Sequence, residues 1–300
     1  MNWLKLKQKQ DQNSNAGTPP KEEQAALSAA TIVYGSLPAI KLRSPLPKEV
    51  PFVAQATFEA PEMGYWYHPV LLGTSTVETL ATSPVCLRQA IQIIEKLEKD
   101  DYVQYLLAYY QAGLERFGEA WRYADIVTVL LAAARLIRPT SYLEIGVRRG
   151  RSMAMVASTC PECEIVGFDI WRENYASMAN PGPEFVQSEI KKVGYRGRLE
   201  LISGNSHETV PRYFKEHPDA FFDLITVDGD HSAKGAEQDL RDVMPRVKIG
   251  GMLVFDDISH PTQPHLLEVW QRVVGANRQW ITWEFCELGY GVGIAIRKEV

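Results

Sequence analysis

The sequence predicts an α/β fold with a mostly parallel sheet of seven strands, helices on both faces and an antiparallel hairpin at the C-terminal end. Three observations predict it. Short apolar runs alternate with amphipathic stretches of helical period, as in parallel sheets. The first five runs each end in polar residues, at the edge where such sheets bind ligands. Two glycines follow the first run, where a strand would turn into a helix.

Five apolar runs predict the parallel strands, and two later runs joined by a glycine-containing turn predict the closing hairpin. The expected strands are 141–145, 164–169, 199–203, 222–227, 251–255, 279–284 and 290–297.

Helical periodicity predicts one helix after each parallel strand and three helices before the first strand. The expected helices are 84–99, 102–117, 118–137, 152–160, 184–193, 206–217, 233–244 and 264–275. Residues 1–25 are polar and are expected to be disordered, and residues 26–83 are rich in proline without a clear period.

Composition narrows the class of protein. The chain is 45% hydrophobic and 23% charged with a net charge of -5, which is typical of a globular protein. It has no long basic run, no apolar secretory signal and no apolar stretch of membrane-spanning length. We therefore expect a cytoplasmic protein whose partners are neither nucleic acid nor membrane. A homodimer is compatible with the sequence.

The first predicted strand carries an acid, Glu144, and turns through Gly146 and Gly150. Glycine lets the backbone approach a ligand closely, and the following helix offers free N–H groups. The dinucleotide fingerprint is G-x-G-x-x-G, whereas the spacing here is G-x-x-x-G. A carboxylate would repel a pyrophosphate but suit an ammonium and a sulfonium. The turn therefore favours S-adenosylmethionine over NAD, with a plain strand–turn–helix as the structural alternative.

Four motifs extend this pattern along the chain: L-E-I-G-V-R-R-G, G-F-D, D-L-I-T-V-D-G-D-H and I-G-G-M-L-V-F-D-D. Over residues 119–300 the sequence resembles the class I S-adenosylmethionine-dependent methyltransferases. The last two motifs look most like the small-molecule O-methyltransferases of the catechol and macrolide-sugar type. The resemblance implies a Rossmann-like fold and a hydroxylated small molecule as methyl acceptor. It divides the chain into a tail (1–25), an N-terminal helical extension or lid (26–118) and the methyltransferase domain (119–300).

Several strand-end residues are candidates for binding the cofactor. Asp169 ends the second strand, where an acid accepts hydrogen bonds from ribose hydroxyls. Trp171 could stack near the adenine or simply pack, and Ser206 could also cap the following helix. The expected cofactor-binding set is Glu144, Gly146, Gly150, Ser152, Asp169, Trp171, Gly204, Asn205, Ser206 and Asp228.

Three further acids, Asp228, Asp256 and Asp257, follow two strands expected to be neighbours. Carboxylates that lie close together repel one another, and a hard divalent ion such as Mg²⁺ resolves this with oxygen ligands. The alternative is three separately solvated acids. In the metal-dependent enzymes that the sequence resembles, Asn stands where this chain has Asp257.

His231 is the candidate general base. It follows Asp228 by three residues, where the catechol-type enzymes carry a lysine, and imidazole suits proton abstraction near neutral pH. It could equally bind the metal or orient Asp230. Lys234 is the reserve base. His260 and His265 are expected to be surface residues, although either could bind substrate.

The region before the methyltransferase-like part contains an aromatic segment, Tyr65-Trp66-Tyr67-His68. It could line an acceptor pocket or pack under a loop. Three other functions stay open: a metal-independent O- or N-methyltransferase, a nucleotide-binding oxidoreductase, and a non-catalytic cofactor-binding protein of the same fold. The missing G-x-G-x-x-G disfavours the oxidoreductase.

Overall fold

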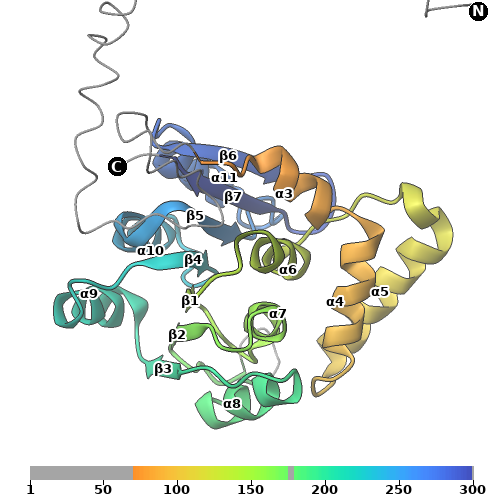
Figure 1. The fold of residues 1–300 in the computed structure, drawn as a ribbon, viewed down its shortest axis with the longest axis horizontal. Coiled ribbons are helices and arrows are strands. Elements are labelled where there is room, and N and C mark those ends of the chain that lie inside the picture. Colours follow the sequence, from red (N-terminus) through yellow and green to blue (C-terminus); the bar gives the residue numbers. More distant parts are fainter. Residues whose placement is uncertain (1–69, 175–178, 299–300) are drawn as a thin grey trace, which may run out of the picture. The chain divides into compact units, whose positions relative to one another are not determined.

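A seven-stranded sheet with the order β3-β2-β1-β4-β5-β7-β6 forms the centre of the computed structural model (Figure 1). The structure describes residues 70–174 and 179–298. Strands β1 to β5 run parallel, whereas β7 is antiparallel to both β5 and β6. This confirms the predicted sheet. Its strands are β1 (Ser141–Ile145), β2 (Glu164–Asp169), β3 (Leu199–Ser203), β4 (Phe222–Val227), β5 (Val247–Asp256), β6 (Trp280–Phe285) and β7 (Val292–Arg297).

The helices cover both faces of this sheet (Figure 1). On one face lie α6 and α7, with α3, α4, α5 and α8 around them, and on the other lie α9, α10 and α11. Their bounds are α3 (Thr74–Ala81), α4 (Pro84–Ile94), α5 (Asp101–Phe117), α6 (Ile126–Ile137), α7 (Arg151–Thr159), α8 (Pro183–Lys192), α9 (Ser206–Glu216), α10 (Ala233–Val243) and α11 (His265–Trp270). None of the described helices is long and apolar enough to span a membrane.

The core is divided by the sheet into two layers, because successive strand residues point to opposite faces. In β1, Tyr142 packs into the layer under α6 and α7, and Leu143 packs into the layer under α9 and α10. Leu224 and Ile225 of β4 alternate in the same way. Burial on both faces explains why these strands are nearly continuous apolar runs in the sequence.

Helix α6 corrects one prediction. The expected helix over 118–137 begins only at Ile126, and Gly118–Ala120 is a separate 3₁₀ turn. The carboxylate of Asp125 accepts the N–H of Thr128, and the hydroxyl of Thr128 accepts the N–H of Asp125. This reciprocal capping fixes the first turn of α6 at Ile126.

Other boundaries also moved. Strand β5 begins four residues earlier than predicted, because Gly250, with φ of +78°, lies within the strand instead of preceding it. Helix α4 ends at Ile94 instead of continuing to 99, and the expected helix over 264–275 is α11 followed by a π-helical turn, Gln271–Gly275. Helix α3 was not predicted.

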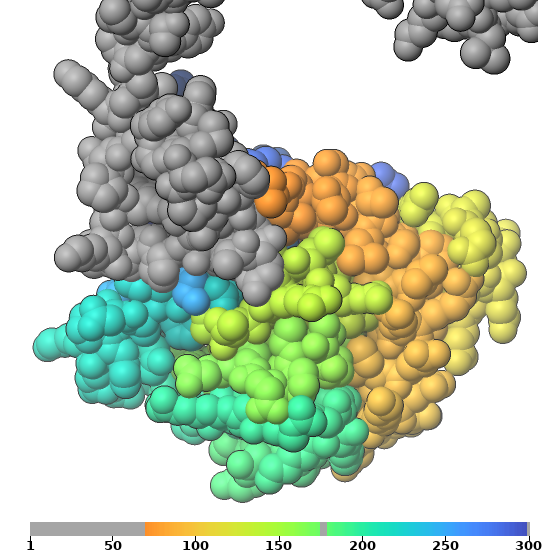
Figure 2. Space-filling view, in the orientation of Figure 1, coloured from red at the N-terminus to blue at the C-terminus, as the bar shows by residue number. Residues whose placement is uncertain are grey.

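The helices before β1 form an outer layer. Helix α3 packs against α6 and β6, and α4 packs against α6 and α7. In Figure 2 the orange surface of α3 and α4 adjoins the yellow-green and green surface of the residues that follow. The extension thus contains three helices between residues 74 and 117. The predicted tail (1–25) and the aromatic segment Tyr65-Trp66-Tyr67-His68 lie outside the described residues, and the domain boundary at 118 stays a prediction.

Candidate functional site

The carboxyl ends of the parallel strands lie at one edge of the sheet, and the predicted site residues gather there. Strands β1 and β4 are direct neighbours, so the residues that follow them meet. Gly146 has φ of +90°, and a Cβ built on it would lie 1.8 Å from the carbonyl oxygen of Asp228. Only glycine therefore allows the turn after β1 to lie against the residue that follows β4.

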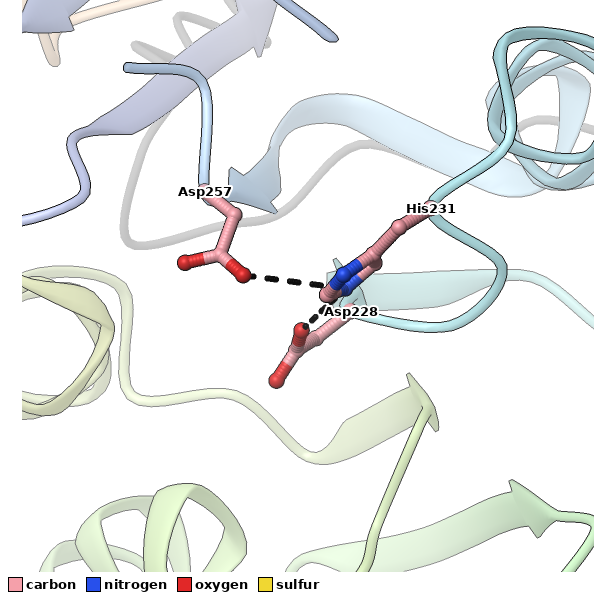
Figure 3. A group of neighbouring side chains, drawn as sticks. All are labelled: Asp228, His231 and Asp257. Carbon is pink, nitrogen blue, oxygen red and sulfur yellow. Dashed lines mark hydrogen bonds and ion pairs between the residues drawn. The ribbon is translucent and has the colours of Figure 1, made fainter. Parts of the chain in front are cut away.

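Asp228, His231 and Asp257 form a close group at this edge (Figure 3). Nε2 of His231 lies 3.4 Å from Oδ1 of Asp228 and 3.7 Å from Oδ2 of Asp257. One ligand atom from each residue lies within 4.8 Å of the other two. Two carboxylates and an imidazole at this spacing are a donor set that suits a divalent cation.

The three residues perturb one another electrostatically. Desolvation, and then the charge of Asp228, raise the pKa of Asp257 to about 7. Burial by itself would lower the pKa of His231, but the hydrogen bond with Asp228 and the nearby carboxylates outweigh it and raise that pKa above its usual value. At neutral pH the group therefore carries protons that a cation would displace.

Asp256 and Lys234 do not join this group. Asp256 is the last residue of β5, and desolvation together with the charges of Asp257 and Asp228 raises its pKa well above the usual value. Asp257 turns away from the strand with φ of +61° and faces His231. Lys234 is exposed on α10. The metal role of Asp256 and the base role of Lys234 stay predictions.

Glu144 lies under the turn after β1 and is fully buried. The hydroxyl of Ser152, in α7, donates a hydrogen bond to Oε1 of Glu144, so two predicted site residues are in direct contact. Oε2 is buried and has no hydrogen-bond partner within residues 70–174 and 179–298. Desolvation is the main cause that raises the pKa of this carboxyl to about 8. The carboxyl therefore holds its proton at neutral pH until a positive charge approaches.

Gly150 begins α7 in a left-handed conformation, with φ of +73°, and provides no side chain to cap the helix. A Cβ at this position would lie 2.9 Å from Cγ1 of Val186 in α8. The first turn of α7 contains no acidic residue. This end of the helix therefore carries a partial positive charge beside Gly146 and Glu144.

Asp169 is fixed at the end of β2 by two backbone groups. Its Oδ2 accepts the N–H of Arg148 at 2.6 Å, and its Oδ1 accepts the N–H of Trp171 at 2.6 Å. Trp171 has φ of +52°, and its indole N–H donates to the hydroxyl of Ser203 at 2.8 Å. Each carboxylate oxygen keeps a further lone pair that a ribose hydroxyl could use.

The turn after β3 corrects the proposed helix cap. Asn205, not Ser206, caps α9, because its side chain accepts the N–H of His207 at 3.1 Å. Ser206 is the first residue of the helix. Gly204, with φ of +134°, donates its N–H to the carbonyl of Asp169, so the ends of β2 and β3 are tied together.

Sequence reasoning missed two supports of the loop after β4. His265, expected on the surface, is half-buried, and its Nε2 lies 2.7 Å from the carbonyl oxygen of His231. The fully buried carboxylate of Asp239, in α10, accepts the N–H of Asp230 at 3.4 Å and lies 3.6 Å from His207. The sequence signal for the contact between Asp239 and Asp230 was an acidic residue at a core position of α10.

A cavity of about 520 Å³ lies elsewhere, at the amino-terminal edge of the sheet, where Ser141, Arg198 and Lys248 are among its lining residues. None of the predicted site residues lines it. The candidate site is placed at the carboxyl edge because the Asp228–His231–Asp257 group and the glycine turn meet there.

Comparison with known proteins gives a match to the part of the chain that forms this edge. Residues 143–258 match the family model described as a methyltransferase domain. Among curated proteins no sequence matches the chain.

Solved structures with a similar fold include three methyltransferases. The calicheamicin methyltransferase CalS11 is 20% identical, with 71% of this chain and 91% of that chain covered and a TM-score of 0.42. The O-methyltransferase TomG from Streptomyces achromogenes is 18% identical, with 67% and 92% covered and a TM-score of 0.47. The O-methyltransferase from Bacillus cereus is 13% identical, with 75% and 96% covered and a TM-score of 0.46. All three TM-scores lie below 0.5, so these similarities carry no argument about function.

Proposed function

Because residues 143–258 match a family model described as a methyltransferase domain, we propose that this chain transfers a methyl group from S-adenosylmethionine to a hydroxyl group of a small molecule, assisted by a divalent cation. The observation that carries the proposal is the position of the Asp228–His231–Asp257 group. It lies directly against the glycine turn after β1, since Gly146 contacts the backbone of Asp228. A reacting hydroxyl and a sulfonium methyl held at these two places would be neighbours.

The turn after β1 supports the methionine end of the cofactor. Glu144 provides a buried carboxyl that a cofactor ammonium would ionise, and Ser152 holds its orientation. Gly146 and Gly150 leave room for the ligand, and the start of α7 suits a carboxylate.

The ends of β2 and β3 support the nucleoside end. Asp169 is proposed to bind the ribose, and Trp171 and the Gly204-Asn205-Ser206 turn to lie near the adenine. The hydrogen bond between Trp171 and Ser203 keeps the indole over this edge. Asp228 completes the proposed cofactor set from the side of β4.

The metal proposal is founded on the donor set. Asp228 and Asp257 would supply carboxylate oxygens, with His231 or Asp256 as a further ligand. A bound divalent cation supplies Lewis acidity, which lowers the pKa of an acceptor hydroxyl and fixes its position. An acceptor with two adjacent oxygens, such as a catechol, a sugar diol or a hydroxy acid, fits such a site.

His231 is proposed as the group that removes the proton from the acceptor hydroxyl, with Lys234 as the reserve. Two carboxylates beside the ring stabilise the imidazolium that forms. If the histidine is a metal ligand instead, the cation would lower the pKa of the hydroxyl and solvent would accept its proton. A cytoplasmic location and a small-molecule acceptor without nucleic-acid or membrane partners complete the proposal.

Two measurements test this function. Isothermal titration calorimetry with S-adenosylhomocysteine and with NAD tests the cofactor, and binding of NAD alone would overturn the methyltransferase reading. An unbiased acceptor screen, run with EDTA and with added Mg²⁺ or Mn²⁺, tests the reaction. Full turnover after exhaustive chelation would leave the metal-independent O- or N-methyltransferase. Cofactor binding without turnover of any acceptor would favour the non-catalytic alternative.

A further inference from the structure

Three arginines follow the glycine turn after β1 in the segment Arg148-Arg149-Gly150-Arg151. In the structure, all three side chains contact the start of α5, in the helical layer that precedes β1.

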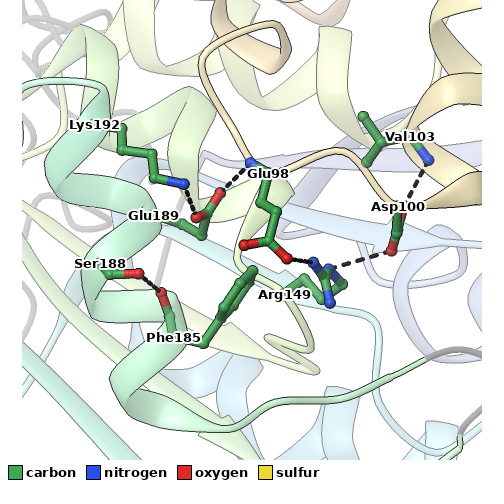
Figure 4. Close-up of polar contacts among 8 residues, drawn as sticks. All are labelled: Glu98, Asp100, Val103, Arg149, Phe185, Ser188, Glu189 and Lys192. Carbon is green, nitrogen blue, oxygen red and sulfur yellow. Dashed lines mark hydrogen bonds and ion pairs between the residues drawn. The ribbon is translucent and has the colours of Figure 1, made fainter.

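Arg149 makes the most extensive contact (Figure 4). Its Nη2 lies 3.1 Å from Oε1 of Glu98, and its Nε lies 3.2 Å from Oδ2 of Asp100. The guanidinium carbon lies 4.4 Å from the ring centre of Phe185 in α8. With only 12% of its side chain exposed, Arg149 joins the connection between α4 and α5 to α8. Ion pairs shielded in this way are weakened less by solvent than fully exposed pairs.

A second contact holds the same connection from the other side (Figure 4). Glu189 of α8 is buried, and its Oε2 accepts the backbone N–H of Glu98 at 2.6 Å. Lys192 pairs with the other oxygen of this carboxylate. The α4–α5 connection is therefore held both by α8 and by Arg149.

The neighbouring arginines share one aromatic ring. The guanidinium carbon of Arg151 lies 4.6 Å from the ring centre of Tyr102, and that of Arg148 lies 5.8 Å from it. Tyr102 is in the first turn of α5, two residues after Asp100. The turn after β1 is thus held from outside by the N-terminal helical layer.

We infer that Arg149 is a positioning residue for cofactor binding, acting through the backbone of the glycine turn and not by contact with the cofactor. The inference rests on the proposed function, in which this turn binds the methionine end of S-adenosylmethionine. Arg148, next to Arg149 in this turn, has φ of +51°, a left-handed conformation that non-glycine residues adopt at a cost and hold only where surrounding contacts fix it. Contacts that fix such a turn in the ligand-free protein reduce the conformational entropy that is lost when the ligand binds.

The test compares binding of S-adenosylhomocysteine by calorimetry in the full chain and in four variants. Arg149→Met removes the guanidinium but keeps an unbranched apolar stem, and Arg149→Lys keeps the positive charge. Asp100→Asn removes one of the two ion pairs of Arg149 and leaves the one with Glu98. Asn still caps α5 in place of the carboxylate that accepts the N–H of Val103. Arg196→Met is the matched control, because Arg196 forms an exposed ion pair with Glu162.

Arg149→Met should raise the dissociation constant by about 3- to 30-fold, the range for residues that modulate a site without touching the ligand. Asp100→Asn should shift it in the same direction, Arg149→Lys should restore part of the affinity, and Arg196→Met should leave it unchanged. With an acceptor identified, the KM for the cofactor should rise while kcat changes little, because the reacting groups are untouched.

Wild-type affinity in folded Arg149→Met would overturn the inference, as would equal weakening in the Arg196→Met control. If Arg149→Met does not fold, Asp100→Asn decides, and wild-type affinity in that variant would overturn it. Failure of the unaltered chain to bind S-adenosylhomocysteine would overturn the proposed function and this inference together, which distinguishes the two.

Discussion

The side chain of His265 contacts the backbone of His231: Nε2 of His265 lies 2.7 Å from the carbonyl oxygen of His231. The first residue of α11 thereby fixes the loop after β4, whose side chains form the candidate metal group. His265→Ala should lower kcat by about tenfold, the scale for losing an outer partner of a metal site. Cofactor affinity should stay unchanged. His260→Ala is the control, since that ring packs in a tilted arrangement against Tyr290. Equal kcat in the two variants would contradict the role of His265.

Replacing His231 by alanine should lower kcat by about 10²–10⁴-fold, the usual contribution of a general base. Binding of S-adenosylhomocysteine should change little. In the unaltered enzyme the rate should decrease as pH falls through the raised pKa of His231, because a protonated ring cannot accept a proton. A pH–rate profile of both proteins checks this. If the variant retains the wild-type rate, His231 is not the base. Either Lys234 would then accept the proton, or solvent would accept it from a metal-bound hydroxyl.

Metal binding should compete with protons. The pKa of Asp257 is about 7 and that of His231 is raised, so both groups must lose protons before they can bind a cation. Affinity for Mn²⁺ should therefore fall by about tenfold or more per pH unit below 7, for one or more displaced protons. Asp257→Asn should abolish most of the binding, while exposed Asp219→Asn should not. A titration at pH 6 and 8 that gives equal affinities would refute the assignment.

Glu144 should make folding stability depend on pH in the ligand-free chain. Its folded pKa of about 8 lies above the usual 4.5, so the native state binds the extra proton between these values. Stability is therefore fully present below about pH 4.5 and declines as pH rises through 8, by at most about 5 kcal/mol. Glu144→Gln should flatten this decline and stabilise the chain at pH 9 relative to the unaltered protein. Denaturation at pH 5 and pH 9 gives the free energy of unfolding of both proteins. An equal change between the two pH values in both proteins would disprove the role of Glu144.

The parallel strands were predictable because each is buried on both faces. Strand β4 is buried at all six positions, and its bounds match the apolar run in the sequence. The start of α6 was not predicted, because the apolar residues before Asp125 continue the hydrophobic stretch and hide the capping pair with Thr128. Helix α3 has only two buried residues, Val77 and Ala81, and therefore shows no clear period.

The candidate site was predictable only in part. The sequence places Asp228, Asp256 and Asp257 at neighbouring strand ends, because parallel strands end at one edge. Which acid faces His231 depends on the positive φ of Asp257, and a backbone angle of this kind in an aspartate has no reliable sequence signal. The bond between His265 and His231 joins residues 34 apart and likewise follows only from the packing of α11.

The strand order has a consequence for how the chain is made. Among the described strands β6 pairs with β7 alone, and β7 follows β6 in the sequence but lies between β6 and β5 in the sheet. During synthesis, therefore, Trp280–Phe285 leaves the ribosome before the strand that will connect it to the rest of the sheet. Until β7 is available, this aromatic segment has no sheet partner and β5 exposes its unpaired edge, and both are surfaces that other nascent chains can join.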